Sequence, residues 1–161
     1  MRRFVFFTAV MFCMAIMPAS VFGQDLEGSM SAYRVTLNKQ GEELFEKVDN
    51  AAPGELIEYR IFYQNKGETV VSNLKVDGPV PANTQYVAGS ADGNVPYALL
   101  VSIDHGNTWE PEPVKRMKRM PDGTEQEVII PVAEYTQIRW VSQKPFGPNE
   151  EQKFDYRVEL K

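Results

Sequence analysis

The sequence predicts an all-β protein folded as an antiparallel sandwich of about 8–10 short strands. Apolar and polar residues alternate with a period of two in successive segments from about residue 30 onward, as expected for strands with one buried face. Clusters of Pro, Gly, Asn and Asp separate these segments and supply the backbone angles that tight turns need. No amphipathic helical pattern of 10 residues is evident, so the core is expected to form between sheets.

The N-terminus predicts a secretory signal peptide at residues 1–23. Two arginines precede an uncharged run of 14 residues, Phe4–Met17, and small residues follow. This order is typical of a signal peptide, whereas a membrane-spanning helix needs about 20 apolar residues. We expect export and cleavage after Gly23, with a cut after Ala19 or an uncleaved anchor as the alternatives.

The remaining 138 residues are enough for one domain. We expect a flexible lead-in at residues 24–29 and a single sandwich domain at residues 30–161. This part has 15 basic residues (17 minus the two in the signal) and 22 acidic ones, a net charge of −7, which argues against binding to nucleic acid or anionic lipid. Cys13, the only cysteine, lies in the signal, so we expect no disulfide in the mature chain. Met11 and Phe12 before it are too bulky for a lipidation motif, so we expect no lipid anchor, and after cleavage of the signal we expect no membrane span.

The clearest predicted strand is Leu56–Asn65, bounded by turn residues on both sides. Charged and polar residues alternate there with a row of four apolar ones, and a helix would mix the two sets on one face. The apolar row is Ile57, Tyr59, Ile61 and Tyr63.

Nine further strands are expected from shorter alternating segments. Ala32–Leu37 places Tyr33, Val35 and Leu37 on one side. Pro121-Asp122-Gly123 predicts a hairpin tip, and Pro131–Thr136 predicts a single helical turn. In chain order the nine strands are Ala32–Leu37, Leu44–Val48, Val70–Val76, Thr84–Val87, Leu99–Ile103, Val114–Met120, Gln126–Ile130, Gln137–Ser142 and Phe154–Leu160.

The predicted core collects the inward side chains of these strands. Burial of each large apolar side chain contributes about 1.5–3 kcal/mol, which can offset chain entropy without disulfides. Trp140, beside Arg139, is expected in a central strand with its indole inward and the Arg139 guanidinium outward. The core residues are Tyr33, Val35, Ile57, Tyr59, Ile61, Tyr63, Leu74, Val76, Tyr86, Leu100, Ile129, Trp140, Tyr156 and Val158.

Residues 102–109 fit the pattern S-x-D-x-G-x-T-W, the Asp-box hairpin familiar from sialidase propellers. Asp104 is expected to accept hydrogen bonds from loop amides, Gly106 to adopt a positive φ, and Trp109 to pack beneath the loop. A propeller enzyme would need several copies, and one copy in a domain of this size cannot build its blades. We therefore predict structural roles for Asp104, Gly106, Trp109 and, in the core, Trp140.

No catalytic constellation is predicted. His105, the only histidine, is expected at an exposed turn, and no G-x-S-x-G elbow is present. A zinc site at His105 would need three carboxylates, and adjacent acids such as Glu42 and Glu43 point to opposite faces of a strand. The prediction is a protein that is not an enzyme, with no catalytic or cofactor-binding residue.

Acidic residues in loops suggest calcium as one alternative, because oxygen ligands from several loops could meet at one end of a sandwich. No D-x-D-x-D-G loop is present, and acids favour turns for backbone reasons alone. No metal ligand is therefore assigned. The acids concerned are Asp77, Asp92, Asp104 and Asp122.

Residues 115–120 form a basic patch on an acidic protein. Strand alternation places charges on both faces, which predicts an exposed edge or a protruding hairpin. One interpretation is docking on an acidic partner or a polysaccharide; the other is that charged edges prevent aggregation. The candidate contact residues are Lys115, Arg116, Lys118, Arg119 and Trp109.

A set of short motifs resembles, in order, the bacterial conserved repeat called domain of unknown function 11. The match covers about residues 30–161, and its specificity lies in the order of the motifs. They are Ala52-Pro53-Gly54-Glu55 with Tyr59 and Ile61, Asn65-Lys66-Gly67, Asn73–Val76, Val80–Thr84, Tyr86–Ser90, the hairpin at 102–109, Ile138-Arg139-Trp140 and Phe154–Leu160.

The resemblance implies an immunoglobulin-like sandwich without enzymatic activity, of a kind found in exported and surface proteins, usually as repeats in a stalk. Gly78 stands where the family has an Asp, with Asp77 one place earlier, and Asn149 replaces a Gly, which Asn can do at positive φ. One copy without a stalk or sorting signal favours a soluble partner or small subunit over a fibre.

We therefore expect a non-catalytic interaction module of the bacterial envelope, in the periplasm or at the cell surface. Its expected partner is an envelope or surface protein, or a polysaccharide, and the sequence leaves its oligomeric state open. The alternative is a carbohydrate-binding or calcium-stabilised adhesion module. A carbohydrate site would need an exposed row of aromatic rings, for which Tyr97, Trp109 and Phe146 are the candidates.

Overall fold

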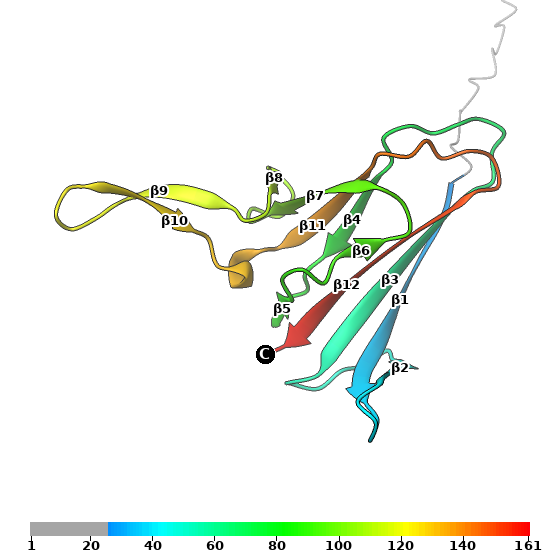
Figure 1. The fold of residues 1–161 in the computed structure, drawn as a ribbon, viewed down its shortest axis with the longest axis horizontal. Helices are drawn as coiled ribbons and strands as arrows, with labels where there is room; N and C mark the ends of the chain where they lie inside the picture. Colours follow the sequence, from blue (N-terminus) through cyan, green and yellow to red (C-terminus); the bar gives the residue numbers. More distant parts are fainter. Residues whose placement is uncertain (1–25) are drawn as a thin grey trace, which may run out of the picture.

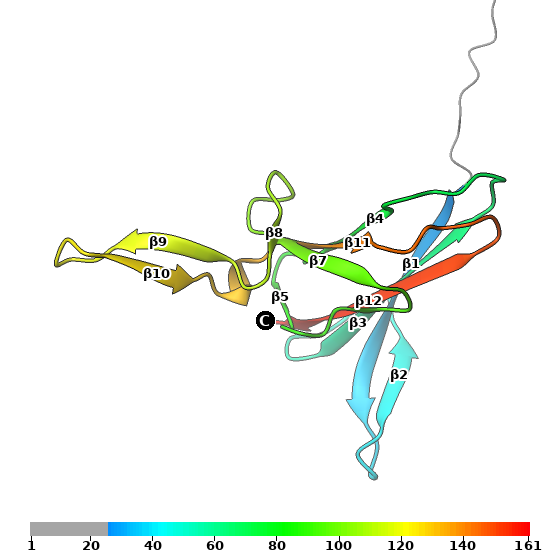
Figure 2. The same cartoon turned by 45° about the horizontal axis from the view of Figure 1, so that its top comes forward.

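The computed structural model describes residues 26–161. The predicted signal peptide at residues 1–23 and the first two residues of the predicted lead-in lie outside this part. Within it, two antiparallel sheets face each other and a two-stranded arm extends from one end (Figures 1 and 2). The prediction of an all-β antiparallel sandwich is confirmed, with 12 strands because two very short ones add to the predicted set.

The large sheet has six strands in the order β2-β1-β3-β12-β5, with β6 also paired to β12. The first and last long strands of the described chain, β1 and β12, both pair with β3. The strands are β1 (Leu26–Leu37), β2 (Glu43–Lys47), β3 (Leu56–Asn65), β5 (Thr84–Tyr86), β6 (Asp92–Gly93) and β12 (Glu151–Leu160).

The small sheet has four strands in the order β4-β11-β7-β8. The remaining two strands, β9 and β10, pair only with each other, and a single 3-10 turn, η1 (Val132–Glu134), leads back into the small sheet where the helical turn was predicted. The strands are β4 (Lys75–Pro79), β7 (Tyr97–Ser102), β8 (Glu110–Pro111), β9 (Lys115–Arg119), β10 (Glu125–Ile129) and β11 (Gln137–Ser142).

Strand β1 begins at Leu26, so residues 26–29, predicted to belong to a flexible lead-in, are paired with β3. Backbone pairing needs no apolar side chain, so the polar composition of this segment concealed the strand. Gly28 lies opposite Tyr63, and a Cβ at Gly28 would come within 2.9 Å of the Tyr63 ring. The glycine therefore makes room for an aromatic neighbour.

Strand β4 covers Lys75–Pro79 and not the predicted Val70–Val76. Asn73 has a positive φ of 54°, which interrupts the extended backbone before β4. Val71 instead forms an isolated bridge with Phe146. Pro79 is tolerated because β4 lies at the edge of the small sheet, where one side of its backbone has no strand partner.

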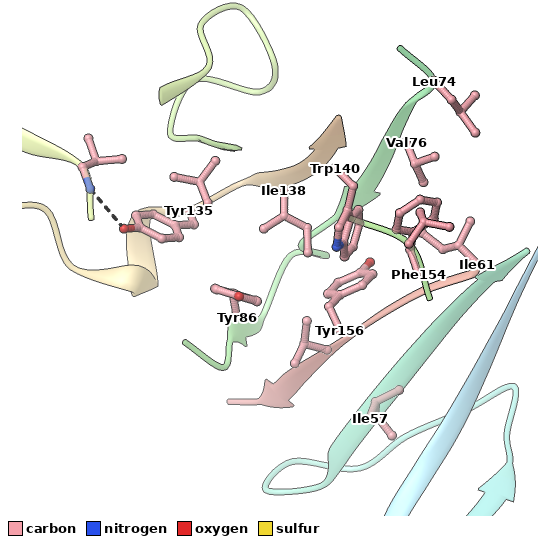
Figure 3. Packing of buried hydrophobic residues seen from close by; sticks show 14 of the residues in the cluster. Ile57, Ile61, Leu74, Val76, Tyr86, Tyr135, Ile138, Trp140, Phe154 and Tyr156 are labelled. Atoms are coloured by element: carbon pink, nitrogen blue, oxygen red, sulfur yellow. Dashed lines mark hydrogen bonds between the residues drawn. The ribbon is translucent and has the colours of Figure 1, made fainter. Parts of the chain in front are cut away.

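The core lies between the two sheets and centres on Trp140 (Figure 3). The indole is fully buried, and its centroid lies 5.6 Å from the Phe154 ring and 5.7 Å from the Tyr156 ring. The inward orientation predicted for Trp140 is confirmed. The buried cluster is Ile57, Ile61, Leu74, Val76, Tyr86, Val95, Val101, Val114, Tyr135, Ile138, Trp140, Phe146, Phe154, Tyr156 and Val158.

Four residues predicted for the core lie elsewhere. Tyr33 and Val35 pair with Glu58 and Leu56 and so lie on the outer face of the large sheet; Val35 is buried there, as predicted, but outside the cluster between the sheets. Leu100 pairs with Arg139 on the outer face of the small sheet, and Ile129 is exposed on the arm. Alternation separates the two faces of a strand but does not say which face the second sheet covers.

Candidate interaction site

The hairpin β9–β10, called the arm below (residues 115–129), extends away from the sandwich (Figures 1 and 2). Its five cross-strand pairs run from Lys115–Ile129 to Arg119–Glu125. At the tip, Gly123 has a φ of 85° and the Asp122 carboxylate accepts hydrogen bonds from Thr124. The structure thus confirms the hairpin turn at residues 121–123 and the protruding position predicted for the basic patch.

The arm is attached to the sandwich at its base only. Val114 is buried; its carbonyl accepts a hydrogen bond from the Ile130 amide at 2.9 Å, and its own amide lies 3.4 Å from Tyr135 Oη (Figure 3). Arg116 donates two hydrogen bonds to Glu110 of β8. Apart from these contacts, the arm is held together by the pairing of β9 with β10. An isolated two-stranded hairpin is only marginally stable in water.

The structure divides the four arm cations into two pairs. Lys115 forms an ion pair with Glu127 at 2.9 Å, and Arg116 forms one with Glu110. Lys118 and Arg119, nearer the tip, have no ion-pair partner among residues 26–161. The positive charge that remains free is therefore concentrated at the outer end of the arm.

Two apolar side chains accompany this charge. Met117 is 64% exposed and Ile129 is 63% exposed. The register pairs Lys115 with Ile129 and Met117 with Glu127, so both apolar residues lie on the same face of the arm. A surface that combines exposed apolar side chains with charged ones is suited to contact with a partner molecule.

The Asp-box hairpin has the structural role that the sequence predicts. Asp104 accepts hydrogen bonds from the Thr108 amide at 2.9 Å, the Thr108 hydroxyl at 2.7 Å and the Ser102 hydroxyl at 2.8 Å. These hydrogen bonds, led by that of the Thr108 amide, lower the pKa of Asp104 to about 2. Gly106 has the expected positive φ, and its carbonyl accepts a hydrogen bond from Trp109 Nε1 at 3.0 Å.

Trp109 also belongs to a row of side chains across the outer face of the small sheet. The Arg139 guanidinium lies 3.7 Å from the centre of the Trp109 ring and donates two hydrogen bonds to Asp77. The outward position predicted for Arg139 is confirmed. The row Trp109–Arg139–Asp77 runs from the residue before β8 through β11 to β4.

The remaining polar groups of the hairpin are engaged in its folding. The Ser102 hydroxyl is buried, donates to Asp104 and accepts from the Gly106 amide at 2.8 Å. His105 is exposed with a φ of 58°, and its amide donates to Thr136. Ser102 and His105 lie only three positions apart, but the hydrogen bonds of the Ser102 hydroxyl go to Asp104 and Gly106 and not to His105.

The four loop acids considered for calcium are not brought together. Each has its own local contacts: Asp77 with Arg139, Asp92 with the Gly93 amide, Asp104 within its loop and Asp122 with Thr124. In the part of the chain that the structure covers, no three His, Asp or Glu side chains are grouped so as to hold a metal ion. Nor does any helix of this part have the length and apolar character needed to cross a membrane.

The three aromatic residues considered for carbohydrate binding do not form an exposed row. Phe146 is fully buried in the core. Tyr97 packs edge-on against Phe154 and donates its hydroxyl hydrogen to the Ala91 carbonyl. Trp109 is covered on one face by Arg139.

Sequence reasoning missed an ordered network on the outer face of the large sheet. Glu58 is only 5% exposed there and forms ion pairs with Arg60 at 2.7 Å and Arg157 at 2.9 Å. Arg157 also binds Glu43 of β2, and the Arg60 guanidinium lies between the rings of Tyr33 and Phe45, about 4.5 Å from each. The alternation of Glu58 and Arg60 along β3 was the available signal, but their partners lie on other strands.

Two of the grooves outside the arm are lined in part by charged residues or by core residues. One, of about 480 Å³, opens between the large sheet and the 81–84 loop and is lined by Ala32, Ile57 and Tyr59 among others. The other, of about 570 Å³, includes Asp92, Asp155 and Arg157, and burial, with Glu58 and Asp92 nearby, raises the pKa of Asp155. In the second groove, Arg157 is bound by Glu43 and Glu58.

Comparison with known proteins adds no relative: no family model, no curated protein and no solved structure matches this chain.

Proposed function

We propose that this protein is an exported, non-catalytic interaction module of the bacterial envelope that binds a protein partner through the arm. The observation that carries the proposal is the arm itself, which pairs with no other strand of the described chain and exposes Met117 and Ile129 beside the free cations Lys118 and Arg119. The proposal of export and of an envelope location is supported by the N-terminal pattern of residues 1–23.

Strand addition is the binding mode that these features favour. Both outer edges of the arm carry unpaired backbone amides and carbonyls, which can accept a further strand. The exposed cations favour an acidic segment of the partner, and Met117 and Ile129 provide apolar surface that this segment can bury. A carbohydrate ligand is less well supported, because the candidate rings are buried or covered.

Charge reversal at the arm tip tests the proposal. We expect the full-length wild-type chain to retain partners from envelope extracts and the double variant Lys118→Glu/Arg119→Glu to bind them about tenfold more weakly or worse, because like charges then face each other. The matched control Lys75→Glu/Lys161→Glu makes the same change of charge at exposed positions outside the arm. Equal retention of partners by the wild type and the arm variant would refute the proposal.

A further inference from the structure

A second unpaired strand edge in the molecule is acidic, whereas strand β9 of the arm is basic and the acids of the arm, Asp122, Glu125 and Glu127, lie in its tip and in β10. Strand β2 forms one edge of the large sheet, and every one of its residues is exposed. The segment Glu42–Glu46 reads Glu-Glu-Leu-Phe-Glu, with Leu44 51% and Phe45 40% exposed. It is therefore an acidic edge with an apolar centre.

Strand β9 of the arm has the complementary pattern of charges. Lys115–Arg119 reads Lys-Arg-Met-Lys-Arg, a basic segment of the same length with Met117 at its centre. If Met117 is placed opposite Leu44, each of the four cations lies opposite a glutamate or the ring of Phe45. The backbone allows this register in the parallel direction. Glu42 and Val48 bond to Asn38 and Ala32, and Val114 and Met120 bond to Ile130 and Thr124, so by alternation the backbone groups of Leu44 face β1 and those of Met117 face outward. Opposite residues with these two orientations fit a parallel ladder and not an antiparallel one.

The side-chain faces are consistent with this register. Leu44 and Glu46 share one face of β2, since they pair with Thr36 and Arg34, and Phe45 lies on the other face with Val35. On β9, Lys115, Met117 and Arg119 share a face. Placing Met117 opposite Leu44 thus brings the outer cations to Glu42 and Glu46 on one face, and the remaining cations to Glu43 and Phe45 on the other. Glu46, Glu43 and Phe45 already contact Arg34, Arg157 and Arg60 of their own chain, so each of the three would be shared between two cations.

The arm and β2 project from different parts of the sandwich and lie well apart in both views (Figures 1 and 2). One chain therefore cannot join its own two edges. We propose that the partner of the arm is a second copy of this protein, and that the basic edge of β9 adds to the acidic edge of β2 in that copy. This proposal rests on the proposed function and names its partner.

The contact would be head to tail, because a different surface is used on each copy. Such contacts form rings or open chains according to the rotation between neighbours. The free energy from five paired residues with exposed ion pairs is small, since each exposed ion pair contributes only about 0–1 kcal/mol. We therefore expect association that needs high local concentration and that weakens as salt screens the charges.

A cysteine pair tests the register directly, in full-length chains that carry Cys13→Ser to remove the only native thiol. With Met117→Cys and Leu44→Cys in one chain, mild oxidation at low salt is expected to give a ladder of disulfide-linked oligomers, which 1 M salt suppresses. The matched control pairs Leu44→Cys with Ile129→Cys, an equally exposed position on the other arm strand. A control ladder as strong as the test ladder would overturn the proposal.

Charge exchange provides the second measurement. Sedimentation at low salt should show that Arg119→Glu alone and Glu42→Lys/Glu46→Lys alone lose self-association, and that a mixture of the two regains it. No regain in the mixture would overturn the proposal. Two further outcomes separate this proposal from the proposed function. If neither the ladder nor self-association appears but Lys118→Glu/Arg119→Glu still abolishes capture of an envelope protein, the second copy is excluded while the proposed function stands. If that variant also has no effect on capture, both proposals fail and the charges serve only to protect the strand edge from aggregation.

Discussion

At the scale of single residues, Asp104 shows how a loop motif becomes a stability element. Its carboxylate is held by the Thr108 amide and by two hydroxyl groups, and its pKa lies at about 2, below the ordinary value of 3.8. Since the folded state favours the charged form, this group stabilises the fold above about pH 4 and loses that contribution as the pH falls towards 2.

We predict that Asp104→Asn lowers the melting temperature at pH 7 and that the difference from the wild type shrinks as the pH falls from 4 to 2. The amide keeps the shape of the side chain but has one acceptor oxygen where the carboxylate has two. Thermal unfolding followed by circular dichroism over this pH range provides the measurement. A difference that stays constant with pH would show that the charge of Asp104 does not matter.

The same residues show what a sequence can reveal at this scale. The bonds of Asp104 and Trp109 within the hairpin follow from a local pattern of eight residues, because each partner lies within a few positions. The stacking of Trp109 on Arg139 joins residues 30 positions apart, and nothing in the hairpin pattern indicates it. Local hydrogen bonding was predictable, whereas the contacts that cross the sheet depend on the strand order.

At the scale of elements, strand β4 depends on a position without a side chain. A Cβ at Gly78 would lie 2.8 Å from Tyr156 and 3.1 Å from both Ile138 and Trp140. We predict that Gly78→Ala lowers the free energy of unfolding by about 1–3 kcal/mol, because the side chains of Tyr156, Ile138 and Trp140 must shift within a packed core. Urea denaturation measures the loss.

Gly147→Ala serves as the matched control for Gly78→Ala. The nearest atom to a Cβ at Gly147 is in the Glu150 side chain at 3.5 Å, an ordinary contact distance. This variant should stay within about 0.5 kcal/mol of the wild type. Equal effects of the two substitutions would mean that the core around Tyr156 has room that the structure does not show.

The strands themselves were predictable to different degrees. β3 and β11 have the bounds that alternation predicted, because their two faces differ sharply in polarity. β1 was assigned the wrong face, because Tyr33 and Val35 look like core residues but are covered from outside by the side chains of β2 and β3. Polarity identifies a covered face; it does not identify what covers it.

At the scale of the whole molecule, the sequence predicted an exposed edge or a protruding hairpin for the basic patch, but it did not show that both strands of the arm stand apart from the two sheets. The segments of β9 and β10 have turn chemistry and alternation like those of other strands, and Ile129 was accordingly placed in the core. What separates them is the order of pairing, in which β9 and β10 have no third strand. Sheet membership is a long-range property that local patterns do not carry.

The last strand, β12, closes the sandwich. It pairs with β3 on one side and with β5 and β6 on the other, and it contributes Phe154, Tyr156 and Val158 to the core. Removing one large buried ring typically costs about 3–5 kcal/mol, while a domain has about 5–15 kcal/mol of stability in total. Loss of the strand should therefore exceed what the fold can bear.

We predict that a chain lacking residues 151–161 shows no cooperative urea transition in the fluorescence of its two tryptophans, Trp109 and Trp140. In the matched control, an Asn-Gly turn joins Val114 directly to Ile130 in place of the arm; their backbones are already hydrogen-bonded, and this turn suits a two-residue hairpin. Because the arm lies outside the sandwich, the control should keep a cooperative transition close to that of the wild type. A cooperative transition without β12 would show that the remaining strands form a core by themselves, and loss of the transition without the arm would show that the sandwich depends on the arm.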